Sequence, residues 1–376
     1  MKRIFKVATR AITVTLIFLL PFQEAADAQE FKIRGRLHMD GFYGIHNALQ
    51  FSNGFNNRRA RLGMDGLIDD NWDGRIEIDF ADGGISPNDF RLRRSFENGG
   101  RLWIGQFKVP QGLNELTSSN EITFIERSTP SNVITDSRRM GIAYEQFGSN
   151  LGFKSMIFGR ALGGRGSMTD DMPIGIAFRG VYSPELAGGL LHIGTSVAYE
   201  DLMETNPAGY SDRPECRDSK GGSVRFINAQ VNEVKSTFKS GLELLYMNGP
   251  FSVEGEYLQV NVIRKQDAGD NPKFFGWHLQ TSYVLTGESR SYSKGIAGGV
   301  TPAGESGAWE IALRYSFTDL NNAGFTGGKQ KNITLGVNRY VTQKLRFMGN
   351  VIFVNFANLE SNEKPVLGAL RAQYNF

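Results

Sequence analysis

The last eleven residues of the chain alternate in character, and this alternation restricts the folds that it can adopt. Small or apolar residues occupy every second position and mostly polar residues lie between them: Val366, Gly368, Leu370, Ala372, Tyr374 and Phe376 in the first set, and Leu367, Ala369, Arg371, Gln373 and Asn375 in the second. Successive side chains of a strand point to opposite faces, so one face of this segment suits lipid and the other suits water. An alternating strand that ends in phenylalanine is typical of bacterial outer-membrane β-barrels. A soluble sheet also alternates, so the fold class depends on how often the pattern recurs.

The N-terminal residues predict an export signal. Four basic residues among the first ten precede the apolar run 11–20, and residues 26–28 resemble a cleavage site. We therefore expect residues 1–28 to be a signal peptide and the mature chain to begin at Gln29. The alternative is a short membrane anchor, but a spanning helix needs about 20 apolar residues. No later run is long enough, so no transmembrane helix is expected.

Composition favours a turn-rich, all-β chain. Glycine and phenylalanine are abundant, at 45 and 27 of 376 residues. The formal net charge of +3 is small, which argues against nonspecific binding of nucleic acid by bulk charge. Cys216 is the single cysteine, so an internal disulfide and a multi-cysteine metal site are excluded. We expect no metal site and no cofactor.

About sixteen segments show a period of two residues. In the clearest one, Trp309, Ile311 and Leu313 alternate with polar residues that include Glu310 and Arg314. Charged residues alternate with apolar ones in other segments as well: Asp73, Arg75, Glu77, Asp79, Glu254 and Glu256. Such charges would be costly inside a sandwich core, whereas a water-filled barrel keeps them hydrated. The pattern predicts an all-β fold in which residues 29–376 form a transmembrane antiparallel β-barrel of about 16 strands.

The segments between the predicted strands are alternately long and short. They fall near residues 47–56, 69–71, 82–88, 98–99, 109–137, 148–150, 161–173, 184–188, 201–233, 248–250, 265–272, 287–306, 320–329, 342–344 and 358–364. Long extracellular loops alternating with short periplasmic turns are typical of outer-membrane barrels. Residues 287–306 are the exception and must be a long periplasmic connection. Residues 223–228 could be another strand, but we place them inside the loop 201–233 because an extra strand would break the parity.

Alternation also assigns cationic residues to the lumen. Leu62 faces lipid, so Arg59 and Arg61 face inward, and the same argument places Arg91 and Arg93 inside. Further cations on lumen positions are Arg75, Lys239, Arg314 and Arg371. A barrel of this size leaves an aqueous channel, and arginines that line a channel attract anions. The alternative is that these arginines pair with Asp73, Glu77, Asp79 and Glu310 as part of the polar wall.

The third long connection, 109–137, is too long for a simple surface crossing. Loops of this length are usually functional or disordered, and a loop folded into the barrel would narrow the pore. We therefore expect the third loop to form a constriction.

The chain resembles the phosphate-selective porins O and P over most of its mature sequence. The likeness lies in these segments: Arg58 to Gly63, Gly105 to Lys108, Leu116 to Ser119, Ile122 to Phe124, Glu126 to Ser128, Leu285 to Arg290 and Gly307 to Ser316. The resemblance implies a homotrimer of sixteen-stranded barrels, an inward-folded third loop and a lumenal arginine ladder that draws phosphate to the constriction. Ser118, Ser119 and Arg127 lie on the matching loop motif and are candidates for oxyanion contact, with Lys108 beside them.

Negative charge in the third loop leaves a second function open. Between Lys108 and Arg127 there is no basic residue, whereas Glu115, Glu121 and Glu126 are acidic. An anion that loses its hydration shell there would find less compensation. The leading hypothesis is a passive channel for small anions such as phosphate in the outer membrane of a Gram-negative bacterium, in contact with its lipids. The alternative is a weakly selective general porin.

Two further alternatives to a channel are an enzyme built on a barrel and a purely structural barrel. The chain has four histidines and neither a Gly-x-Ser-x-Gly nor a His-Glu-x-x-His pattern, so no catalytic residue is predicted and an enzyme is not expected. His278 alternates with Gln280 and Ser282, which predicts a solvated position on the lumen wall. A structural or adhesive barrel would pass no current across a planar bilayer.

Overall fold

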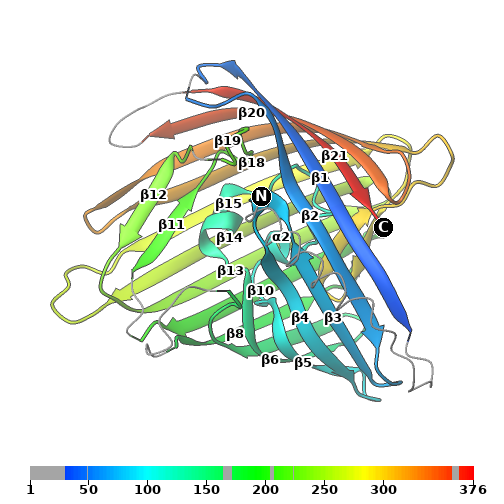
Figure 1. Ribbon diagram of the computed structural model, residues 1–376, viewed down its shortest axis with the longest axis horizontal. Helices are drawn as coiled ribbons and strands as arrows, with labels where there is room; N and C mark the ends of the chain where they lie inside the picture. Colours follow the sequence, from blue (N-terminus) through cyan, green and yellow to red (C-terminus); the bar gives the residue numbers. More distant parts are fainter. Residues whose placement is uncertain (1–29, 49, 164–171, 204–206, 223, 358–363) are drawn as a thin grey trace, which may run out of the picture.

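Each strand of the main sheet is antiparallel to the next strand along the chain, and the last strand pairs with the first. β21 (Val366–Asn375) lies beside β1 (Phe31–His46), from Asn375 opposite Arg36 to Val366 opposite His46, and this pairing closes a barrel (Figure 1). The other strands are β2 (Gly54–Leu67), β3 (Trp72–Asp79), β4 (Ser86–Ser95), β5 (Gly100–Lys108), β6 (Arg138–Phe147), β7 (Leu151–Phe158), β8 (Ile174–Tyr182), β9 (Glu185–Leu186), β10 (Gly189–Asp201), β13 (Val234–Asn248), β14 (Phe251–Arg264), β15 (Lys273–Val284), β18 (Ala308–Asn322), β19 (Phe325–Tyr340) and β20 (Leu345–Ala357). Because the two-residue β9 continues β8 along β10, the described part of the chain forms the sixteen strands that the sequence predicts.

The computed structural model describes residues 30–48, 50–163, 172–203, 207–222, 224–357 and 364–376. The expected signal peptide, residues 1–28, lies outside these ranges. Within them, no helix has both the length and the apolar character needed to cross a membrane.

The outer wall of the barrel is apolar and the inner wall is polar. In β18, Trp309 and Ile311 are exposed on the outside, whereas Glu310 between them is buried on the inside. In β13, Leu242 is exposed and its neighbour Glu243 is buried in the same way. This is the arrangement that a lipid-facing barrel requires, since a charge on the lipid face would cost about 2–4 kcal/mol at mid-depth.

One predicted loop is wrong. Residues 320–329 were expected to form a long connection, but β18 continues to Asn322 and β19 begins at Phe325. Leu320 is fully buried and packs with Val231 and Phe274, so tertiary contacts stabilise the extended hairpin. The sequence around Leu320 is polar and resembles a loop. The contacts that make it a strand come from segments far away in the chain, so the local sequence does not reveal them.

Three connections fold into the barrel instead of remaining outside it. The third loop, 109–137, contains the short helices α2 (Leu113–Leu116) and α3 (Thr129–Ile134), and nearly all of its residues are buried. The connection 201–233 forms a separate hairpin of β11 (Ala208–Asp212) and β12 (Ile227–Val231), so the segment near 223–228 stays outside the barrel sheet, as predicted. The connection after β15 forms a hairpin of β16 (Arg290–Ser293) and β17 (Ile296–Val300). The connection between β3 and β4 contains a single turn of 3-10 helix, η1 (Ala81–Gly83).

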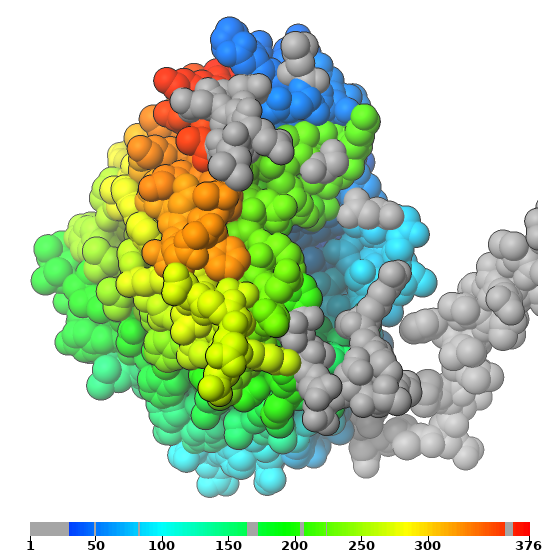
Figure 2. Space-filling model, turned by 90° about the vertical axis from the view of Figure 1, so that its left-hand side faces the viewer, coloured from blue at the N-terminus to red at the C-terminus, as the bar shows by residue number. Residues whose placement is uncertain are grey.

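The inserted segments create hydrophobic cores inside the barrel. Ile134 of α3 and Ile227 of β12 pack against Leu258 and Phe274 of the wall. Figure 2 looks at one end of the barrel, where the chain around β11 and β12 (light green) lies between the strands coloured blue and orange. The lumen is therefore much narrower than a bare sixteen-stranded barrel, which would leave a wide water-filled channel.

Candidate functional site

A cavity of about 270 Å³ lies between the third loop and the strands from β1 to β7. Its described lining includes eight arginines and two lysines but a single carboxylate, that of Asp89. The basic residues are Arg34, Arg36, Arg59, Arg61, Arg75, Arg91, Lys108, Arg127, Arg138 and Lys154. The side chains that line the cavity are therefore predominantly cationic.

The strand register brings these cations together. Arg36 of β1 lies directly opposite Arg61 of β2, and Arg75 of β3 lies opposite Arg91 of β4. Like charges in such positions destabilise a sheet. They are tolerated here because carboxylates bind them: Glu77 of β3 binds both Arg36 and Arg61, and Asp65 and Asp73 bind Arg75 and Arg91.

Aspartates and glutamates hold most of these guanidinium groups in place. Arg61 ion-pairs with Asp79 at 2.7 Å and with Glu77 at 3.2 Å. Arg91 and Arg93 both contact Asp73, at 2.8 and 2.7 Å. The alternative interpretation of these arginines, pairing across the wall, is thus observed, and the paired Arg61 and Arg91 also line the cavity.

Arg59 differs from its neighbours. Its side chain is only 4% exposed, and its Nε and Nη1 atoms have no hydrogen-bond partner among the described residues. A buried guanidinium with free N–H groups is costly unless an acceptor reaches it. Arg59 is therefore the cavity residue best prepared to donate to a bound anion.

The third loop contributes one wall of the cavity. Ser119 Oγ accepts a hydrogen bond from Arg36 Nη1 at 3.0 Å. Arg127 Nε lies 3.0 Å from Glu115 Oε2 and donates to the Asn114 carbonyl at 2.8 Å. Lys108 Nζ donates to carbonyl oxygens of the α2 turn, including that of Glu115. Lys108 and Arg127 thus fix the loop as well as line the cavity.

Two of the three loop glutamates are neutralised by cations. Burial acts to raise the pKa of Glu115, but the charges of Arg127 and Lys108 outweigh it and lower the pKa below its ordinary value. In the same way, Arg58 holds the pKa of Glu126 well below its ordinary value despite burial. Burial raises the pKa of Glu121. Glu115 and Glu126, two of the acidic residues that argued against anion binding in the sequence, are therefore compensated by Arg127 of the loop and by cations of the barrel wall.

A family model described as "Phosphate-selective porin O and P" matches residues 31–376, nearly the whole described chain. The chain belongs to this family. Porin O of Pseudomonas aeruginosa is 29% identical to it over 92% of this chain and 88% of that protein. An uncharacterized protein of Caulobacter vibrioides is 27% identical, and the alignment covers 80% of this chain and 64% of that protein.

The fold agrees with known porins. An anion-selective porin from Comamonas acidovorans superposes with a TM-score of 0.59 at 15% identity, over 93% of this chain and all of that chain. At this identity the likeness concerns the fold alone. The protein is an outer-membrane porin, and this family consists of non-enzymatic channels, as expected from the sequence.

Of the nine candidate residues of this porin, seven line the cavity. Ser118 is among them. The two exceptions are Arg93, which faces the ring of Trp103 at 5.2 Å, and Arg314. Arg314 is almost fully buried elsewhere in the lumen, where it binds Glu215 and the Glu126 carbonyl and so anchors two inserted segments.

Several residues that line the cavity were not among the candidates predicted from the sequence. Arg34 and Arg36 alternate with apolar residues in β1, so the same rule that found Arg59 would have found them. Lys154 and Trp103 had no such signal. Lys154 Nζ lies 3.6 Å from the Trp103 ring centroid, so the indole supports a cation at the cavity wall.

The opposite side of the lumen is acidic and covered. Glu310 of β18 binds Arg290 of the inserted β16 at 3.1 Å. Glu243 of β13 binds Arg179 at 2.6 Å, and Arg179 also donates to the Gly295 carbonyl of the same hairpin. Alternation in the sequence predicts that Glu310 is hydrated, but the inserted β16–β17 hairpin buries it. The cavity is therefore lined by the arginine-rich side of the porin's lumen, whereas the acidic side is covered by the inserted hairpin.

A second cavity, of about 220 Å³, lies beneath the β11–β12 hairpin. Asp212 lines it, and its Oδ2 accepts a hydrogen bond from Asn132 Nδ2 at 3.0 Å. Burial raises the pKa of this carboxyl to about 7, and the hydrogen bonds that oppose this shift are too weak to cancel it.

The raised pKa makes stability depend on pH. In the unfolded chain the Asp212 carboxyl ionises near pH 4, so the porin should lose stability as pH rises from about 4 to about 7, and no more above that. Asp212→Asn should remove this loss, which is at most roughly 4 kcal/mol. Thermal unfolding of the detergent-solubilised porin from pH 4 to pH 8 measures this loss of stability in both proteins. The same pH slope in both proteins would contradict the assignment.

Proposed function

We propose that this porin is a passive channel for small anions and that phosphate or a related oxyanion is its principal solute. The observation that carries the proposal is the cavity in which ten cationic side chains meet one carboxylate. An anion gives up hydration energy on entering a narrow site, and only a positive site compensates that loss. The family match and the anion selectivity named for the Comamonas porin support the same conclusion.

The donors in the cavity suit an oxyanion. Guanidinium groups donate pairs of parallel N–H bonds to carboxylate or phosphate oxygens. Arg59 offers N–H groups that no described acceptor uses, and Ser118 and Ser119 add hydroxyl groups on the loop side. The carboxylates behind Arg61 and Arg91 hold those side chains still, so less entropy is lost on binding.

A weakly selective general porin is the second candidate. It is favoured by one observation, that Asp73, Glu77 and Asp79 already neutralise part of the basic wall. Such a channel would pass phosphate and chloride in proportion to their mobilities.

Bilayer recordings distinguish the two functions. Reversal potentials in a salt gradient should show anion preference, and added phosphate should reduce chloride current in a saturable way. Anion preference without block by phosphate would leave the weakly selective porin as the function. Cation preference would contradict both the cavity argument and the proposal.

Arg290 should affect selectivity although it does not line the cavity. Its Nη1 donates to Thr123 Oγ1 of the third loop at 2.8 Å and binds Glu310. Arg290→Gln leaves more negative charge uncompensated and loosens the loop, so anion preference should fall by about two- to fivefold. Lys294→Gln, at the exposed tip of the same hairpin, is the matched control. An equal effect of both substitutions would show that only bulk charge matters.

We infer from the family that the porin assembles as a homotrimer, and from its N-terminal sequence that residues 1–28 are removed on export. Mass measurement of the detergent-solubilised porin from an outer-membrane preparation tests both. Trimers that begin at Gln29 are expected, and a monomer or an intact N-terminus would contradict the corresponding inference.

A further inference from the structure

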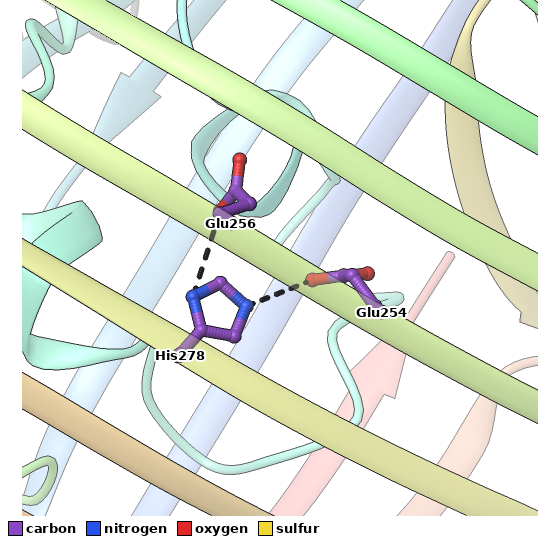
Figure 3. A group of neighbouring side chains, drawn as sticks. All are labelled: Glu254, Glu256 and His278. Atoms are coloured by element: carbon purple, nitrogen blue, oxygen red, sulfur yellow. Dashed lines mark hydrogen bonds and ion pairs between the residues drawn. The ribbon is translucent and has the colours of Figure 1, made fainter.

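Two carboxylates and an imidazole meet on the inner wall of the barrel, away from the arginine-lined cavity. Glu254 and Glu256 are lumen-facing residues of β14, and His278 of β15 lies directly opposite Glu256 in the strand register. His278 Nε2 is 3.3 Å from Glu254 Oε1, and Nδ1 is 3.8 Å from Glu256 Oε2 (Figure 3). One ligand atom from each side chain lies within 4.8 Å of the others.

The third loop covers this cluster. Ser128 Oγ is 3.0 Å from His278 Nδ1, and Asn114 donates through its backbone N–H to Glu256 and through its side-chain amide to Glu254. His278 is 2% exposed, so the sequence-based expectation of a solvated wall position is wrong. The reason is that the loop packs over it.

The two carboxylates of the cluster have no strong cationic partner among the described residues. The ion pairs that Glu254 and Glu256 make within the described residues are both with His278, and neither involves arginine or lysine. Glu256 is 3% exposed, and its Oε1 has no hydrogen-bond partner in the described part of the chain. A buried carboxylate oxygen without a donor is costly, so the cluster is arranged for a cation.

A second histidine in the same barrel provides a contrast. His192 lies 3.2 Å from Glu243, but Arg179 also binds that carboxylate at 2.6 Å. The Glu243 cluster is therefore already neutral, and a metal ion would gain little there.

We propose that Glu254, Glu256 and His278 form a binding site for a divalent transition-metal cation of the Zn²⁺ type. Imidazole nitrogen and carboxylate oxygen are common zinc ligands, and two carboxylates with one imidazole match the charge of the ion. Glu254 and Glu256 contact opposite nitrogens of the imidazole, and a zinc ion binds only one of them, so the ring must turn when the ion binds. Tetrahedral zinc with ligands at about 2.0–2.2 Å places them roughly 3.3 Å apart, whereas one ligand atom from each side chain now lies within 4.8 Å of the others, so the side chains must approach by up to about 1.5 Å. The ligands lie on β14 and β15, so the bound ion would join two neighbouring strands of the barrel.

Calorimetric titration of ZnCl₂ into the metal-stripped, untagged porin in detergent tests the site. One Zn²⁺ per chain is expected, and Mg²⁺ should not compete because it prefers oxygen ligands. His278→Ala should weaken binding by about 100-fold or more and Glu256→Gln by at least about tenfold. X-ray absorption at the zinc edge should show nitrogen and oxygen ligands only.

His192→Ala is the matched control and should leave zinc affinity within about twofold. The isosteric Glu256→Gln keeps the side-chain shape, and an unchanged circular dichroism spectrum shows that the barrel is intact. Absence of stoichiometric binding, or binding that survives both His278→Ala and Glu256→Gln, overturns the proposal. Neither result bears on anion selectivity, because that is measured separately and depends on different residues.

Discussion

Replacing Arg59 with glutamine should reduce the channel's preference for anions by about tenfold or more. Arg59 has two buried nitrogens without partners, so its charge acts directly on an anion in the cavity. A unit charge about 5 Å away contributes on the order of 3 kcal/mol at an effective dielectric constant of 20, which corresponds to roughly a hundredfold in relative occupancy. Neighbouring cations will offset part of the loss. Reversal potentials and phosphate block of chloride current in planar bilayers measure it.

The control for this experiment is Arg93→Gln. Arg93 also faces the lumen, and its substitution also removes one positive charge. However, Arg93 is held by Asp73 and does not line the cavity. Its substitution should change selectivity by less than about twofold, because Arg93 lies outside the cavity lining and its partner Asp73 offsets part of its charge. Equal effects of the two substitutions would mean that the cavity is not the selectivity site.

Replacing Arg371 with methionine should destabilise the porin by about 3–5 kcal/mol. Its side chain is fully buried, binds both oxygens of Asp40 at 2.6 and 2.7 Å and donates to the Ile125 carbonyl of the third loop. Glu126 is a further partner at 3.3 Å. Methionine fills similar volume but leaves buried carboxylates uncompensated, so the unfolding temperature should fall and the loop should loosen, with larger current fluctuations.

Two comparisons make this prediction specific. Arg94→Met, at an exposed position of β4, should change the unfolding temperature little. Adding Asp40→Asn to Arg371→Met should restore part of the lost stability, since it removes one unpaired charge. If Arg371→Met alone unfolds at the temperature of the unaltered porin, the buried network does not hold the loop.

The barrel was predictable because its signal is local. Each strand repeats every two residues, and the alternation of Trp309 with Glu310 shows which face is which without any knowledge of neighbouring strands. Alternation did not predict the extended β18–β19 hairpin around Leu320, because contacts with the distant β12 and β15 stabilise it.

The candidate site was predictable in part. Arg59, Arg61 and Arg91 follow from parity, and Ser119 and Arg127 follow from the family motif in the third loop. Arg138 and Lys154 were missed because a charge on one strand says nothing about which other strands share its cavity. The sequence also did not show that the negative charge of Glu115 is compensated, because this depends on how the loop folds and brings Glu115 to Arg127 and Lys108.

The sequence by itself determined that the chain closes into a barrel, which residues face inward and which loop is long enough to enter the pore. Only the tertiary structure decided which charges are covered and which are open to solute. Alternation is a property of the extended backbone, so any single strand reveals it. Charge compensation depends on distances of a few ångströms between segments that are far apart in the chain, and the packing of the third loop and the β16–β17 hairpin sets those distances. For this reason His278 and Glu310 are buried beneath inserted segments, whereas Arg59 lines the cavity and keeps nitrogens that no described acceptor uses.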